Sequence, residues 1–119
     1  MDAPLIVGRK GIANRSGQVL ASGSSEAYSE VKPLLDAFSD TVVYTGELGT
    51  GTVIKLAHNL VRRGIGLAIG EGLVLGAKAG VDPESLWKAV RQGNSGRRRT
   101  FDVLVEKFLP GQYDPPSFA

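Results

Sequence analysis

The sequence predicts an α/β region over residues 1–46, followed by an all-α region over residues 47–119. The first region contains three short runs of apolar or β-branched residues, with one helical pattern between the second run and the third. Only helical patterns follow the glycine-rich stretch from Gly46 to Gly51, which marks the change of class. Three short strands make a poor sheet by themselves because both edges stay exposed.

The predicted strands cover residues 4–7, 18–22 and 41–45, and each ends at a glycine. Between the second strand and the third, Ser24 or Ser25 is suited to cap a helix that extends to Ser39. Pro33 removes one backbone donor inside that helix, which predicts either a kink or two short helices.

One long helix, from Thr52 to about Ala79, dominates the all-α region, and two shorter helices follow it. Apolar residues occur on nearly every side of the long helix, which is typical of a helix buried between other elements. Gly80 is suited to end the long helix. Asp82 and Pro83 are suited to begin the next helix, which stops near residue 93. The last predicted helix covers residues 97–109. A row of small residues on the long helix favours close packing against another backbone: Ala68, Gly72, Gly76 and Gly80.

Three polar side chains share one face near the start of the long helix. At ~100° per residue, Asn59 lies ~40° around the helix from Lys55, and His58 lies ~60° to the other side. Their neighbours are apolar, so these three residues either cap a surface or converge on a polar ligand.

Composition excludes several kinds of protein. The net charge of +2 is too small to indicate a polyanionic partner, and no reading motif accompanies the arginines at positions 91 and 97–99, so we expect no nucleic-acid binding. The sequence has no cysteine and one histidine, which argues against disulfides and metal sites. It has neither a secretory signal nor an apolar run of membrane-spanning length, so we expect a cytoplasmic protein without a membrane partner.

The glycine turn is followed by Lys55, His58 and Asn59 in a Lys-x-x-His-Asn pattern. Together with other stretches it resembles the middle portion of the β-hydroxyacid dehydrogenases, the family of 3-hydroxyisobutyrate dehydrogenase and 6-phosphogluconate dehydrogenase, and this pattern is the most specific match. The other stretches occur in the family's order, so that the resemblance covers nearly the whole chain: residues 2–4 with Gly8, 17–23, 31–35, 42–46, 71–75, 78–82 and 114–118.

The resemblance implies an NAD(P)-dependent oxidoreductase that acts on a small 3-hydroxyacid. In such an enzyme Lys55 is the general acid/base, and Asn59, His58 and Gly8 are substrate-binding residues. It also implies that residues 1–46 are the C-terminal part of a Rossmann-like nucleotide-binding domain. Residues 47–119 are then the first helices of the all-α dehydrogenase domain, and the long helix lies between domains and joins two copies in a homo-oligomer, as a dimer.

Two departures from the family pattern affect these expectations. Ile6 and Val7 replace the serine and first glycine that bind the substrate carboxylate in the family. The glycine-rich dinucleotide turn is also absent, so we expect this chain alone, as a fragment, to bind neither NAD nor NADP. The alternative is a non-catalytic oligomerisation or interaction module that keeps the fold and has lost cofactor binding.

Overall fold

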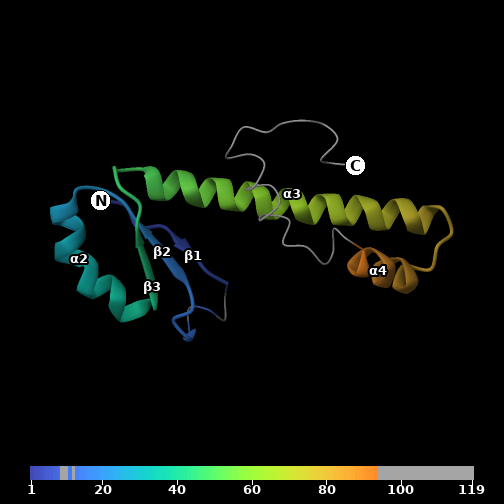
Figure 1. Cartoon of the computed structure of the whole chain (residues 1–119), viewed down its shortest axis with the longest axis horizontal. Helices are drawn as coiled ribbons and strands as arrows, with labels where there is room; N and C mark the ends of the chain where they lie inside the picture. The colour runs from blue at the N-terminus through green and yellow to red at the C-terminus, as the bar shows by residue number, and fades with distance from the viewer. Residues whose placement is uncertain (9–10, 12, 94–119) are drawn as a thin grey trace. The chain divides into compact units, whose positions relative to one another are not determined.

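The computed structural model describes residues 1–8, 11 and 13–93 (Figure 1). The chain divides into two compact units, Met1–Gly66 and Leu67–Ala119. The helix predicted over residues 97–109 lies outside the described residues. The other predicted elements are present in the predicted order, which confirms three short strands with one helix, then a long helix.

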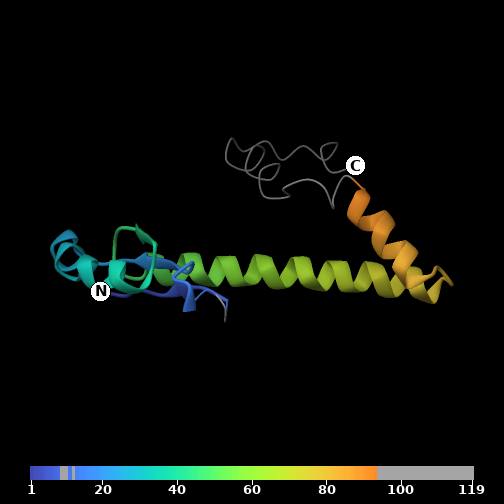
Figure 2. The ribbon, with the colours of Figure 1, turned by 90° about the horizontal axis from the view of Figure 1, so that it is seen from below.

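The first unit contains a three-stranded sheet in the order β1-β2-β3. The strands are β1 (Leu5–Ile6), β2 (Gln18–Ala21) and β3 (Thr41–Tyr44). β1 pairs antiparallel with β2, with Leu5 opposite Val19, whereas β2 pairs parallel with β3. A parallel pair needs a crossover connection, and here it is helix α2 (Ser25–Phe38), which lies beside β3 in Figures 1 and 2.

Helix α2 is continuous on both sides of Pro33, so the alternative of two short helices is wrong. The Ser24 hydroxyl accepts a hydrogen bond from the Ala27 N–H at 3.2 Å, which satisfies one free donor of the first turn. On the other side of Pro33, Leu35 is buried against Val19 and Ala21. Since one half of the helix is capped and the other is packed on the sheet, both halves remain helical despite the missing donor.

Helix α3 (Thr50–Lys78) begins against β2. A Cβ atom on Gly51 would lie 2.4 Å from the Leu20 carbonyl oxygen, so only glycine permits this approach. The Gly51 N–H also donates to the Ser22 hydroxyl at 3.3 Å. The first turn of α3 is therefore fixed to the sheet by both shape and hydrogen bonding.

Most of the rest of α3 is exposed, and only Gly51 of this helix is buried. Large apolar side chains along it have exposed fractions of 55–74%: Val53, Leu56, Leu60, Leu67, Val74 and Leu75. The expectation of a helix buried on nearly every side is wrong for the part of the chain that the structure describes. An apolar pattern indicates that something covers a helix, but not that the covering element belongs to the same segment of chain.

The second unit contains the end of α3 and helix α4 (Pro83–Gln92). Gly80, at φ +87°, ends α3, and the Val81 N–H donates back to the Gly76 carbonyl at 3.1 Å. The Asp82 carboxylate caps α4 by accepting from the Ser85 N–H at 2.9 Å. The predicted roles of Gly80 and Asp82 are confirmed.

The small-residue row on α3 is used for packing at one position. A Cβ on Gly76 would lie 2.3 Å from a terminal methyl of Leu86, so this glycine makes room for α4. Gly72 faces open space. None of the described helices is long and apolar enough to cross a membrane.

Candidate active site

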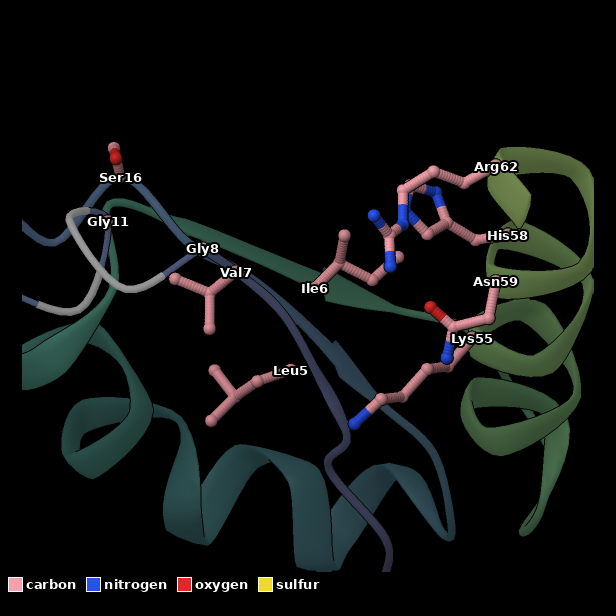
Figure 3. A pocket seen from close by; sticks show the side chains of 10 residues that line it. All are labelled: Leu5, Ile6, Val7, Gly8, Gly11, Ser16, Lys55, His58, Asn59 and Arg62. Atoms are coloured by element: carbon pink, nitrogen blue, oxygen red, sulfur yellow. The ribbon is translucent and has the colours of Figure 1, made fainter. Parts of the chain in front are cut away.

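A pocket of about 730 Å³ lies in the first unit, between α3 and the segment that contains β1 (Figure 3). One wall comes from α3 and the other from β1 and the residues that follow it. The lining residues are Leu5, Ile6, Val7, Gly8, Gly11, Ser16, Lys55, His58, Asn59 and Arg62. All the residues that the sequence singled out as catalytic or substrate-binding are among them.

The α3 wall is polar. Lys55, His58 and Asn59 all point from the helix toward the strand side, as Figure 3 shows. Lys55 and Asn59 are half-buried, whereas His58 is exposed. The structure thus brings the three predicted polar heads into one pocket, where an amine and an amide can contact the same small ligand.

The strand wall is apolar at the two positions where the sequence departs from the family pattern. The side chains of Ile6 and Val7 both line the pocket. Val7 fits because Gly11 and Gly17 have no side chains: a Cβ on either would lie 2.8 or 2.9 Å from a Val7 methyl. The Ser16 hydroxyl on this side donates to the Asn14 side chain at 2.7 Å. Polar recognition therefore depends on the helix wall.

A hydrogen-bonded cluster holds the turn of α3 that precedes Lys55. The Asp2 carboxylate accepts from the Thr52 hydroxyl at 2.6 Å and also from the Ser22 hydroxyl. Ser22 in turn accepts from the Gly49 N–H at 3.2 Å. The hydrogen bond from Thr52 is the main reason why the pKa of Asp2 lies below its ordinary value. Lys55 follows Thr52 by about one helical turn. The cluster therefore fixes where Lys55 lies along β1.

Arg62 is a pocket residue that the sequence reasoning missed. It follows Asn59 by three residues and His58 by four, so it continues the same helix face by one further turn. Extending the polar stripe would have found it. Leu5, Gly11 and Ser16 were also missed, and nothing in their local sequence marks them as pocket residues, because only the packing of β1 beside α3 brings them there.

The charged lining residues, Lys55 and Arg62, are both cationic. The ion pairs among the described residues involve other side chains: Arg15–Asp40, Lys32–Asp36 and Lys88–Glu84. The described residues also contain no cluster of ligands suited to a metal ion. A wall whose described residues include two cations and no carboxylate is suited to a small anion.

Comparison with known proteins identifies the family. Residues 49–119 match the model for the NAD-binding domain of NADP-dependent 3-hydroxyisobutyrate dehydrogenase. The chain belongs to the 3-hydroxyisobutyrate dehydrogenase family. Its sheet and helices are accordingly the α/β edge of a Rossmann-type fold followed by helices, as the sequence predicted.

Similar members of the family are hydroxyacid dehydrogenases. The chain is 28% identical over 109 residues to 2-(hydroxymethyl)glutarate dehydrogenase of Eubacterium barkeri. This alignment covers 92% of the chain and 36% of that enzyme. The chain is 32% identical over 119 residues to L-threonate dehydrogenase of Pectobacterium atrosepticum, which covers 98% of the chain and 38% of that enzyme. The chain thus spans little more than a third of the length of these curated relatives.

Among solved structures, the chain is similar to the 3-hydroxyisobutyrate dehydrogenase of Mycobacterium tuberculosis with L-serine. The TM-score is 0.68 at 27% identity, over 82% of this chain and 33% of that one. The likeness therefore extends over most of this chain and a third of the enzyme.

Proposed function

We propose that this chain supplies the substrate side of the active site in an NAD(P)-dependent dehydrogenase that acts on a small 3-hydroxyacid. The observation that carries the proposal is the pocket in which Lys55, His58 and Asn59 converge opposite β1. In this proposal residues 1–46 end the nucleotide-binding domain and residues 47–119 begin the all-α domain. The pocket then lies where residues from both domains meet.

Lys55 is the proposed general acid/base. Oxidation of a secondary or primary alcohol removes the hydroxyl proton and a hydride from the carbon that carries the hydroxyl. The neutral form of the Lys55 amine accepts that proton, and the ammonium form returns it to the carbonyl oxygen in the reverse direction. NAD or NADP, when bound, supplies the hydride acceptor.

Asn59 and His58 orient the substrate in this proposal. The Asn59 amide offers both a donor and an acceptor to hydroxyl or carboxylate oxygens. Gly8, at the end of the strand wall, lets a substrate approach the backbone because no side chain is present there. Ile6 and Val7 face the substrate as apolar surface, so they favour a carbon chain and not a charged group on that side.

The experiment places this chain in a complete dehydrogenase. The matching segment of the Pectobacterium atrosepticum L-threonate dehydrogenase is exchanged for it, and oxidation of 3-hydroxyacids is followed by the absorbance of NADH or NADPH. We expect Lys55→Ala to lower kcat at least 100-fold, a normal loss for a general acid/base. Lys78→Ala, on an exposed residue of the same helix outside the pocket, is the matched control and should stay within twofold.

A Lys55→Ala loss below threefold, with an unchanged circular dichroism spectrum, would refute the acid/base role. If the exchanged enzyme is inactive, binding of L-serine to the purified 119-residue chain is measured by NMR. Equal binding by the parent and Asn59→Ala chains would then count against the pocket as a substrate site.

The exposed apolar side chains of α3 favour a second function beside the first, association with another copy of the chain. Large exposed apolar patches commonly mark protein–protein interaction sites. Sedimentation at micromolar concentration should therefore show a species larger than the 12.6 kDa chain. A single species of that mass would remove the association proposal and leave the dehydrogenase proposal unaffected.

A further inference from the structure

We infer that Arg62 makes this pocket selective for hydroxyacids that carry a second carboxylate, which the guanidinium binds while Lys55 works at the hydroxyl. This inference rests on the proposed function and adds the class of substrate to it. Arg62 lines the pocket, and in Figure 3 its side chain extends from α3 in the same direction as that of His58, toward Ile6.

The spacing on α3 suits two separate binding points. Lys55 and Arg62 are seven residues apart, so their Cα atoms are separated by roughly 10 Å along the helix axis. His58 and Asn59 lie between them on the same face. The two side chains therefore offer separate contact points to one ligand, Lys55 at one end of the wall and Arg62 at the other. The pocket volume of about 730 Å³ is in the range that accommodates ligands larger than a simple three- or four-carbon monocarboxylate.

The charge pattern points to an anion at the Arg62 end. Among the described residues, none that lines the pocket is acidic, and the ion pairs found there leave Arg62 out. A guanidinium binds a carboxylate through two parallel hydrogen bonds, which a lysine amine cannot reproduce. Both cations therefore attract anionic groups, and Arg62 has the geometry that fits a carboxylate.

The apolar strand wall strengthens the inference. Ile6 and Val7 present no side-chain donor to the pocket, and Val7 occupies the space that Gly11 and Gly17 leave open. A carboxylate placed against this wall would lose hydration without gaining a side-chain partner. Most side-chain donors available to the anionic groups of a ligand therefore lie on α3: Lys55, Asn59, His58 and Arg62.

The test uses two probes that differ by one carboxylate, 3-hydroxybutyrate and 3-hydroxyglutarate. Their dissociation constants for the purified 119-residue chain are measured by NMR titration at 0.15 M salt. We expect 3-hydroxyglutarate to bind about fivefold more tightly, since Arg62 is exposed and solvent screens its ion pairs. Arg62→Gln should remove this difference, because the glutamine amide cannot form the paired, charge-assisted hydrogen bonds of a guanidinium with a carboxylate.

Arg63→Gln is the matched control, because Arg63 is also exposed, carries the same charge and does not line the pocket. The inference is overturned if the two probes bind equally, or if Arg63→Gln weakens 3-hydroxyglutarate as much as Arg62→Gln does. Equal binding of both probes leaves the proposed function standing. If neither probe binds, the inference fails, and the proposed function then depends on the Lys55 experiment alone.

Discussion

Replacing Gly51 by alanine tests how the pocket is built. Gly51 is the buried residue at the start of α3, where a Cβ would lie 2.4 Å from the Leu20 carbonyl oxygen and 3.2 Å from its carbon. Both atoms belong to the backbone of the central strand β2, which cannot move without disturbing its pairing with β1 and β3. The start of α3 must therefore shift away from the sheet, and Lys55, one turn further along, shifts with it.

The expected cost follows from these contacts. Forcing one extra methyl into a tight site costs about 1–3 kcal/mol. The shift also weakens the hydrogen bond from the Gly51 N–H to Ser22. Gly64→Ala in the same helix is the matched control, because a Cβ there meets nothing within 4 Å. That change should stabilise the chain by up to about 1 kcal/mol through helix propensity. The two alanines should therefore act in opposite directions.

Urea unfolding followed by circular dichroism measures both variants. All chains are compared at one protein concentration, because association would make stability depend on it. We expect a lower midpoint for Gly51→Ala and an equal or higher midpoint for Gly64→Ala, with similar slopes. If Gly51→Ala is as stable as Gly64→Ala, then α3 does not dock against β2 as described, and the geometry of the pocket is wrong with it.

Three further predictions follow from other contacts. The pKa of Asp2 is lowered, chiefly by the Thr52 hydroxyl, so its stabilising effect is present above the ordinary value of 3.8 and is lost as pH falls through the lowered pKa. Thermal melts of Asp2→Asn should therefore fall below the parent at pH 7 and approach it as the pH falls further below 3.8; a constant difference would contradict the linkage. Gly76→Ala should raise the free energy of unfolding by about 1 kcal/mol more in a Leu86→Ala background than in the parent, because only the parent has a Leu86 methyl in the way of the new Cβ. If the effects of the two substitutions on the free energy of unfolding are additive, α4 does not pack against Gly76 as described. Fluorescence titration of the chain with NADH and NADPH should show no saturable binding, and a micromolar dissociation constant would show that the missing glycine-rich turn is not needed.

Much of the local structure could be predicted from the sequence because it depends on neighbouring residues. Ser24, Gly80 and Asp82 end or begin helices through hydrogen bonds and backbone angles within a few positions of themselves. The shared face of Lys55, His58 and Asn59 follows from helical geometry alone. The same geometry contained Arg62, which was missed because the polar stripe was not extended by one turn.

The tertiary structure decided most of what stands opposite that face. Leu5, Gly11 and Ser16 are more than 35 residues from Lys55 in the sequence, and no local pattern indicates that they share a pocket with it. Ile6, Val7 and Gly8 were expected there only through the family resemblance. The need for glycine at position 51 is equally nonlocal, because it comes from the short distance to the Leu20 carbonyl oxygen of strand β2. The sequence by itself determined which side chains share a face, because helix periodicity is a local property. Only the folded chain decided which backbone comes close enough to make that face one wall of a pocket.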